Sequence, residues 1–274
     1  MTEQQTPAAA RAARSSFYGG MRILPRPQRE AMFEIYAFCR AVDDVADDPG
    51  PREPRRARLQ RWRDDIDALY AGAPPPPLGG LAQAVKTFDL QRADFLAVID
   101  GMEMDVVADI RAPDRATLEL YCDRVACAVG RLSVRVFGME RAAGLALADQ
   151  LGRALQLTNI LRDLDEDAAM GRLYLPRDAL RDVGIISTDP QTVLANPMLG
   201  EACGVLIELA RQHFAKAQAI MQHAPRRTVR APRIMGEAYG LILERLVARG
   251  FAPPRPRARL PRLQLLLIVL RNLI

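Results

Sequence analysis

The chain has 274 residues, of which 49% are hydrophobic and only 5% aromatic. This length suits one large domain or two small ones, and the abundance of Ala, Leu and Arg favours helices over a β-sandwich or barrel. The formal net charge is +5, but seven arginines and no acidic residue follow Glu244. Because a nucleic-acid-binding protein usually carries its positive charge on the folded domain rather than in a tail, we predict no nucleic-acid partner.

The cysteine pattern and hydropathy indicate a cytoplasmic protein. The four cysteines form no CxxC pair and no zinc-binding spacing, which fits a reducing compartment. The N-terminus lacks the apolar segment of a secretory signal, and no apolar run approaches the roughly 20 residues that span a bilayer.

Helical periodicity recurs along the chain and predicts an all-α single domain of about eight to ten helices. The polar residues 1–14 are expected to be disordered, and the folded domain is expected to cover 15–252. Asp114 is a predicted N-cap, while Glu103 and Asp105 interrupt an otherwise apolar helical face. Residues 181–197 are expected to be irregular. The predicted helices cover 28–46, 53–71, 81–88, 93–107, 114–137, 142–167, 199–223 and 232–249.

The helix over 28–46 ends in a cluster of carboxylates. Asp43 and Asp47 are four residues apart, so they share one helix face and repel each other. They also lie at the helix C-terminus, where the macrodipole disfavours anions. A bound cation would relieve both effects, and carboxylates are ligands that Mg²⁺ prefers. The alternative is a solvated acidic helix end without a ligand.

A second acidic motif repeats this arrangement at Asp163 and Asp167, with Asn159 one turn earlier. Two such helix ends facing each other across a cavity would hold a metal cluster and favour diphosphate chemistry. Arg40 and Arg162 adjoin the acids and suit phosphate contact, although each alternatively pairs with its neighbouring Asp. Neither histidine lies near these acids in the sequence, so a histidine-based site is poorly supported.

The segment 253–274 is a separate basic and apolar tail, with arginines before the apolar run 263–270. Two interpretations remain open. The tail forms either a membrane-surface helix attracted to anionic lipid or a final helix that covers the bundle.

Five stretches of the chain resemble the squalene/phytoene synthase family, the trans-isoprenyl head-to-head synthases. The resemblance implies an all-α isoprenoid synthase helical bundle with a central apolar cavity. Within the family, residues 99–105 and 163–176 are most similar to bacterial members that make presqualene diphosphate for hopanoid biosynthesis. The five stretches are Ser15–Tyr18, Ile35–Asp47, Tyr121–Gly130, Leu155–Asp163 and Gly171–Pro176.

The resemblance also implies a reaction. Two farnesyl diphosphates would be joined head to head into presqualene diphosphate with release of one diphosphate. The expected cofactor is Mg²⁺, with Mn²⁺ as a substitute, and no NADPH is expected. The product would pass to downstream squalene-forming enzymes, which suits a location at the inner face of the cell membrane. Alternatives are phytoene or dehydrosqualene synthesis for carotenoids, and a non-catalytic helical scaffold of the same fold.

Site residues follow from the resemblance, motif by motif. Tyr121 matches a tyrosine near the proton-removal step and is expected to be catalytic, with the acids of the two motifs. Either Arg257 or Arg259 is expected to contact diphosphate, and the sequence does not decide between them. Phe17, Tyr36 and Phe38 would either stabilise a carbocation or belong to the core. The metal-linked set is Asp43, Asp44, Asp47, Asn159, Asp163 and Asp167, and the substrate-binding set is Ser16, Phe17, Tyr36, Arg40, Gln156, Asn159, Arg162 and Tyr239.

Overall fold

A computed structural model describes residues 18–108 and 110–273 and shows an all-α architecture in these residues. The expected disorder of 1–14, and the predicted site residues Ser16 and Phe17, lie outside the described residues. The helices are α2 (Tyr18–Arg22), α3 (Arg26–Ala46), α4 (Arg52–Tyr70), α5 (Gly79–Phe88), α6 (Arg92–Val107), α7 (Arg115–Cys122), α8 (Ala128–Val136), α9 (Arg141–Arg162), α10 (Leu164–Ala169), α11 (Arg177–Asp182), α12 (Pro190–Leu194), α13 (Leu199–His223), α14 (Arg226–Arg249) and α15 (Arg262–Leu273), with a 3₁₀ turn at Pro76–Leu78 and a π-helical turn at Asp123–Cys127.

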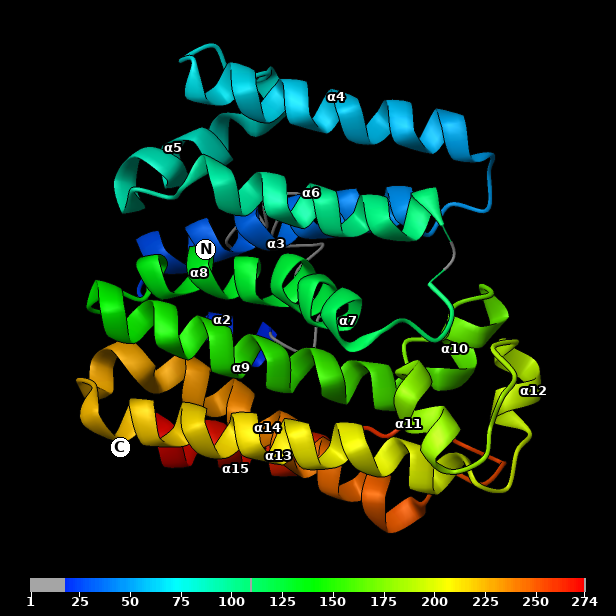
Figure 1. Ribbon diagram of the computed structural model, residues 1–274. Helices are drawn as coiled ribbons and strands as arrows, with labels where there is room; N and C mark the ends of the chain where they lie inside the picture. The colour runs from blue at the N-terminus through cyan, green and yellow to red at the C-terminus, as the bar shows by residue number, and fades with distance from the viewer. Residues whose placement is uncertain (1–17, 109, 274) are drawn as a thin grey trace.

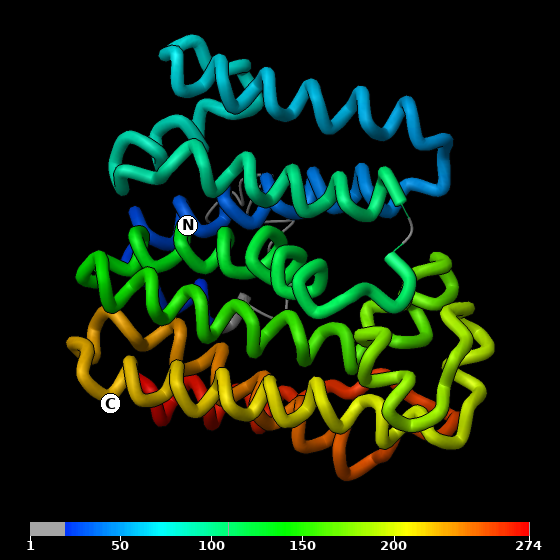
Figure 2. The backbone as a smooth tube through the Cα atoms, viewed as in Figure 1, coloured from blue at the N-terminus to red at the C-terminus, as the bar shows by residue number. Residues whose placement is uncertain are grey.

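The long helices lie roughly side by side in successive layers (Figure 1). Helix α4 forms one outer edge, α3 and α6 follow, α8 and α9 lie in the middle, and α13, α14 and α15 form the opposite edge (Figure 2). The short helices α10, α11 and α12 gather at one end of the bundle. Helices α3 and α9 both run toward the end where the short helices lie.

Local sequence signals explain where several helices begin. Asp114 caps α7 as predicted, because its carboxylate accepts a hydrogen bond from the Thr117 amide at 2.7 Å. Glu140 caps α9 by accepting from the amides of Ala142 and Ala143. These side chains satisfy amide groups that the first helical turn leaves without partners.

Three expected boundaries were wrong. The helix predicted over 142–167 stops at Arg162, because Asp163 leaves helical geometry at φ −103° and ψ 16° before α10 begins. The segment 181–197 contains α12, which Asp189 caps through the Thr192 amide. Helix α14 starts at Arg226 rather than 232, since Pro232 lies inside the helix and is buried. Because the connections form short helices of their own, the described helices are more numerous than expected.

The core extends through two main hydrophobic clusters. One joins α3, α4, α5, α6 and α8, and the other joins α9 and α13 with the short helices and α14. Phe38 belongs to the first cluster, where its ring packs edge-on against Trp62 at 5.5 Å and Phe95 at 5.1 Å. With 2% exposure it is a core residue and does not line the central cavity, so the carbocation alternative is excluded for this ring.

The π-helical turn packs closely against α9. An added Cβ on Gly152 would come within 2.9 Å of the Cys127 backbone nitrogen and Cα, a distance at which one of the two helices must move. A π-turn inserts one extra residue into a helix and often marks a functional site. Here the turn lies between Tyr121 and Val129, both of which line the cavity.

The C-terminal segment returns along the bundle and ends in α15, which packs on α14 and α2 (Figure 1). Ile268 is buried against Ile234 and Ala238. Arg271 forms an ion pair with Glu237 at 2.5 Å. The tail is therefore a helix docked on the bundle, as one of the two interpretations expected.

We predict that Gly152→Ala lowers the stability of the protein by about 1–3 kcal/mol, because the new methyl group meets backbone atoms that cannot rotate away. Gly204→Ala is the matched control. Gly204 is exposed within α13, and no atom lies within 4 Å of the position that its methyl group would take, so this change should stabilise the helix by about 0.5–1 kcal/mol. Chemical denaturation of both variants measures the two shifts, and equal stability of the two would contradict the packing argument.

Candidate active site

A central cavity of about 660 Å³ lies between α3, α6, α8, α9 and α14. One end is apolar, with Met21, Met32, Phe137 and Leu147 in its wall. The other end carries the charged side chains of both acidic motifs. The cavity volume falls within the range of about 300–1,000 Å³ that small-molecule sites occupy, and its split between apolar and charged ends suits a ligand with a hydrocarbon chain and an anionic head.

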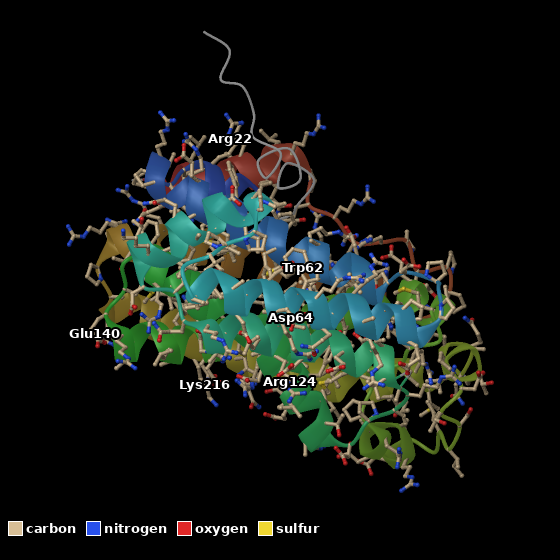
Figure 3. The ribbon with its side chains drawn as sticks, turned by 90° about the horizontal axis from the view of Figure 1, so that it is seen from above. Arg22, Trp62, Asp64, Arg124, Glu140 and Lys216 are labelled. Carbon is tan, nitrogen blue, oxygen red and sulfur yellow. The ribbon has the colours of Figure 1, made fainter. Side chains whose placement is uncertain are left out.

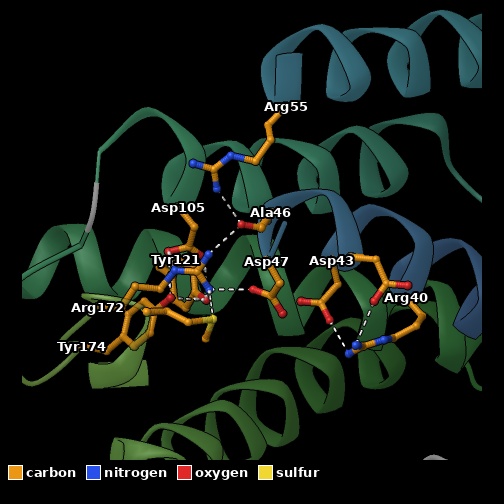
Figure 4. A network of polar contacts seen from close by, with 11 residues as sticks. Arg40, Asp43, Ala46, Asp47, Arg55, Asp105, Tyr121, Arg172 and Tyr174 are labelled. Carbon is orange, nitrogen blue, oxygen red and sulfur yellow. Dashed lines mark hydrogen bonds and ion pairs between the residues drawn. The ribbon is translucent and has the colours of Figure 1, made fainter. Parts of the chain in front are cut away.

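The first acidic motif lies at the C-terminal end of α3, with Asp43 and Asp47 in the cavity wall. Asp44 points elsewhere, because its side chain is 56% exposed and does not line the cavity. Arg40 forms ion pairs with Asp43 at 2.7 Å and Asp44 at 2.8 Å (Figure 4). The expected intrahelical pairing of this arginine is therefore present in the structure.

Arg172 joins the first motif to the rest of the site (Figure 4). Its guanidinium is buried and donates to an Asp47 carboxylate oxygen at 2.8 Å and to the carbonyl oxygen of Ala46 at 2.8 Å. Arg55 donates to the same carbonyl at 2.9 Å. The guanidinium groups of Arg172 and Arg55 thus lie at the C-terminus of α3, where the helix dipole favours cations. They offset part of the repulsion between Asp43 and Asp47. From the sequence, a bound cation was expected to relieve this repulsion.

The second motif has its own arginines. Arg162 forms a two-point ion pair with Asp163, with distances of 2.8 and 2.6 Å, and Arg257 from the tail reaches the same carboxylate at 3.0 Å. The planar arginine fork suits such paired contacts. Arg257 lines the cavity and also pairs with Glu166 at 2.7 Å, whereas Arg259 does not line it. The geometry therefore places Arg257, and not Arg259, at the site.

Burial and mutual repulsion change the acidity of two carboxyl groups. Burial, followed by the charge of Asp47, raises the pKa of Asp43 to about 6. Burial, followed by the charge of Asp163, raises the pKa of Asp167 to about 8. The raised pKa values reflect acids that the fold holds close together although their negative charges repel. Such pKa shifts are common at functional sites.

Asn159 supplies a further polar atom to the cavity. Its side-chain oxygen Oδ1 is buried and has no hydrogen-bond partner among the described residues. Because buried polar atoms are nearly always paired, this oxygen indicates a ligand. An amide oxygen between carboxylates is a suitable donor for a hard divalent cation.

A buried polar cluster lies beside the two motifs, around Asp105 of α6. The Tyr174 hydroxyl donates to one Asp105 oxygen at 2.7 Å, and the Tyr121 hydroxyl lies 3.1 Å from the other. The two tyrosine rings stack with their centroids 4.7 Å apart. Arg172 is 3.9 Å from Asp105, so this cluster and the first acidic motif share one guanidinium (Figure 4).

The structure brings most of the predicted site residues to one cavity. Asp44 is the described exception, because it faces outward. The predicted residues in the cavity wall are Tyr36, Arg40, Asp43, Asp47, Tyr121, Gln156, Asn159, Arg162, Asp163, Asp167 and Tyr239.

The buried polar cluster contributes three side chains to the cavity wall that were not among the predicted site residues: Asp105, Arg172 and Tyr174. Asp105 interrupts an otherwise apolar helical face, and this interruption was the sequence feature that could have indicated a functional residue there. Arg172 and Tyr174 belong to a stretch that carried the family resemblance, yet nothing in that stretch indicated contacts with Asp47 and Asp105.

Outside the two acidic motifs, another group of side chains lies close enough together to share a metal ion. Among the described residues, Asp123, Cys127 and Asp149 have ligand atoms within 4.8 Å of one another. Arg131 pairs with Asp123 at 2.8 Å, and Arg153 pairs with Asp149, so arginines already neutralise these acids. In the part of the chain that the structure describes, no three carboxylates of the two acidic motifs come this close together.

Sequence comparison identifies the family of this chain. The model of the squalene/phytoene synthase family matches residues 10–264. The chain belongs to the squalene/phytoene synthase family. It is 60% identical to the presqualene diphosphate synthase of Rhodopseudomonas palustris, over 99% of both chains. It is 35% identical to the phytoene synthase of Mycobacterium tuberculosis, over 87% of this chain and 78% of that protein.

Comparison with solved structures supports the fold. A dehydrosqualene synthase crystal structure superposes with a TM-score of 0.82 and 24% sequence identity, covering 97% of this chain and 93% of the other. The expected isoprenoid synthase helical bundle is therefore confirmed.

We predict that Asp167→Asn raises the melting temperature of the metal-free protein at pH 9 by about 2–4 °C, equivalent to about 1 kcal/mol. The pKa of Asp167 rises from its ordinary 3.8 to about 8 on folding. The folded chain therefore binds more protons between these values, and stability falls as pH rises through about 8. Asparagine carries no charge and avoids this loss.

At pH 5 the Asp167→Asn variant should gain clearly less than at pH 9, because most of the stability loss of the native carboxyl group falls between pH 5 and about 8. Asp64→Asn, at an exposed position of α4 (Figure 3), is the control and should leave both temperatures unchanged. Thermal melts in chelator at the two pH values measure the effect. A lower melting temperature for Asp167→Asn than for the wild type at pH 9 would contradict the prediction that the ionised Asp167 carboxylate destabilises the fold.

Proposed function

We propose that this chain is a presqualene diphosphate synthase, which condenses two farnesyl diphosphates head to head and releases one diphosphate. The observation that carries the proposal is the cavity itself, apolar at one end and lined at the other by two acidic motifs. The higher identity to a presqualene diphosphate synthase than to a phytoene synthase favours this product over the carotenoid alternatives.

The donor set fits a divalent cation, because carboxylates of both motifs and the unpartnered Asn159 oxygen face the same cavity. We propose that Asp43, Asp47, Asn159, Asp163 and Asp167 hold Mg²⁺, with Mn²⁺ as a substitute. When bound, the metal would neutralise the negative charge of the departing diphosphate. Asp44 was expected in this set, but it faces outward and we leave it out.

The cations around the acids would bind the diphosphate groups. We assign this contact to Arg40, Arg162 and Arg257, each of which now pairs with an acid of one motif. Tyr239 adds a hydroxyl beside Arg162, whose guanidinium lies 5.8 Å from the tyrosine ring centroid. With the carboxylates holding metal, these arginines would be free to contact the phosphate oxygens.

The apolar end of the cavity would hold the farnesyl chains. After ionisation, the C2=C3 double bond of the acceptor attacks the C1 cation of the donor, and loss of a proton closes the cyclopropane ring. Water would quench such a cation, so the apolar wall protects the intermediate. Tyr36 and Gln156 line the cavity beside the acids and are assigned to substrate positioning.

Incubation with Mg²⁺ and farnesyl diphosphate, without NADPH, tests the proposed activity. We expect presqualene diphosphate to accumulate with one diphosphate released per product molecule. Product analysis by mass spectrometry distinguishes the alternatives. Phytoene from geranylgeranyl diphosphate, with farnesyl diphosphate inert, would overturn the assignment, and a chain that binds but never turns over either substrate would indicate the scaffold alternative.

In the same assay, Asp43→Asn and Asp163→Asn should each lower turnover by at least about 10²–10³-fold, because each removes a carboxylate proposed to hold the cation that would neutralise the departing diphosphate. Asp48→Asn is the matched control, since Asp48 pairs with Arg58 at 2.6 Å and does not line the cavity. Circular dichroism should show unchanged helicity in all three variants. Full activity of either cavity variant would exclude the metal role.

We propose that the outer face of α15 contacts a membrane surface, which would suit a lipid substrate and the handover of product to squalene-forming enzymes. None of the described helices combines the length and apolarity needed to cross a bilayer. Leu263, Leu266, Leu267 and Leu270 are 48–68% exposed and recur at helical spacing, so they line one face. Arg22 of the adjoining α2 lies beside this helix (Figure 3).

We expect Leu263→Glu/Leu267→Glu to weaken binding to phosphatidylglycerol vesicles at least about tenfold, because burying one leucine is worth about 1.5–3 kcal/mol. Ile186→Glu is the control, since Ile186 is 83% exposed on the loop between α11 and α12. Co-sedimentation at low and high salt measures the effect. Equal binding of wild type and the double variant would exclude α15 as the contact face.

A further inference from the structure

The buried carboxylate of Asp105 has no role in the proposed binding of metal and diphosphate. It is 3% exposed, although an isolated charge in a protein interior is costly. It lines the cavity together with Tyr121, which matches the family tyrosine expected near proton removal. A buried acid beside such a tyrosine requires an explanation beyond packing.

Tyr121 by itself is a poor base. The ordinary tyrosine pKa is about 10, so the hydroxyl of Tyr121 is neutral near pH 7. A neutral phenol is a weak base, and it accepts a proton only if its own proton leaves at the same time. Burial and the adjacent Asp105 charge raise the Tyr121 pKa further, so a free phenolate is not available. The hydroxyl nevertheless has two acceptors within reach, an Asp105 oxygen at 3.1 Å and the Tyr174 oxygen at 3.2 Å.

Both routes from Tyr121 end at the same group. The direct one leads to one Asp105 oxygen, and the other passes through Tyr174, whose hydroxyl donates to the second Asp105 oxygen at 2.7 Å. The stacked rings hold the two hydroxyls in place. Burial raises the pKa of Asp105, which makes it a better proton acceptor, while Arg172 at 3.9 Å opposes that rise and helps keep the carboxylate charged.

We propose that Asp105 is a positioning residue that acts through Tyr121 as the final proton acceptor of the cyclopropane-closing step. The inference rests on the proposed synthase function. The C–H electron pair at the donor C1 forms the new ring bond, and the released proton passes to the Tyr121 oxygen. The phenolic proton of Tyr121 moves to the Asp105 carboxylate, so the positive charge of the carbocation and the negative charge of the carboxylate cancel, and Asp105 becomes a neutral carboxylic acid.

The test uses the purified full-length chain and compares diphosphate release with presqualene diphosphate formation. Asp105→Asn should leave ionisation largely intact but lower ring closure about 10²-fold, within the range that general acid–base groups contribute. The ratio of diphosphate to product should therefore rise well above one, with farnesyl alcohols formed as water captures the cation. A purely structural role would lower diphosphate and product together.

Two further measurements make the result specific. Calorimetry should show that Asp105→Asn binds a non-ionisable farnesyl thiodiphosphate, in the presence of Mg²⁺, with the same affinity as the wild type. Glu103→Gln is the matched control on the same helix, because Glu103 pairs with Arg63 at 2.6 Å away from the cavity, and its ratio should stay at one. If Asp105→Asn fails to fold, Tyr121→Phe, which keeps the carboxylate beside Arg172, must raise the same ratio.

An unchanged ratio in folded Asp105→Asn, or in Tyr121→Phe, would overturn the relay and leave the departing diphosphate as the base. Failure of the proposed function is distinguishable, because it would appear in the wild-type chain as a different product or none. Failure of the relay would appear only in the comparison between wild type and variants.

Discussion

The buried guanidinium of Arg172 is the interaction on which the site depends. It contacts Asp47 and the last carbonyl of α3, and it lies beside Asp105 of α6. Three segments distant in the sequence therefore share one positive charge. Removing one partner of a buried pair costs far more than the pair contributes, because it leaves an uncompensated charge. The end of α3, the last turn of α6 and the loop after α10 are consequently held in one arrangement.

The same electrostatic principle extends to the whole charged end of the cavity. Repulsion among the carboxylates is partly offset by arginines from four different segments, represented by Arg40, Arg162, Arg172 and Arg257. Acids of both motifs therefore lie at one cavity beside positive counter-charges. Under the proposed function, ligand binding would be an exchange of ion-pair partners, in which metal would bind the acids and phosphate would bind the arginines.

The sequence predicted the fold well, because helical periodicity and cap residues such as Asp114 are local signals. Two helix boundaries were nevertheless missed, although the contacts that set them are local. Asp163 stops α9 while its carboxylate is bound at two points by Arg162, and α12 was missed although Asp189 before a proline is a readable cap. The motif acids could be found from their spacing.

The remaining site residues required the tertiary structure. The contacts of Asp105 and Tyr174 join positions 69 residues apart in the sequence, and periodicity carries no information about them. The choice of Arg257 over Arg259 likewise follows from which side chain the extended tail turns toward the second motif. Spacing alone could not settle it, because both arginines lie in the same short basic stretch and either could reach the acids.

The contacts of this tail have a consequence for how the protein is made. Arg255 pairs with Asp165 at 2.7 Å, and Arg257 pairs with Asp163 and Glu166, so the second acidic motif receives two of its counter-charges from the end of the chain. During synthesis the N-terminal part of a protein folds first. The helices around the cavity therefore emerge from the ribosome before these arginines do, and the second acidic motif gains these two counter-charges only after residues 255–257 have emerged.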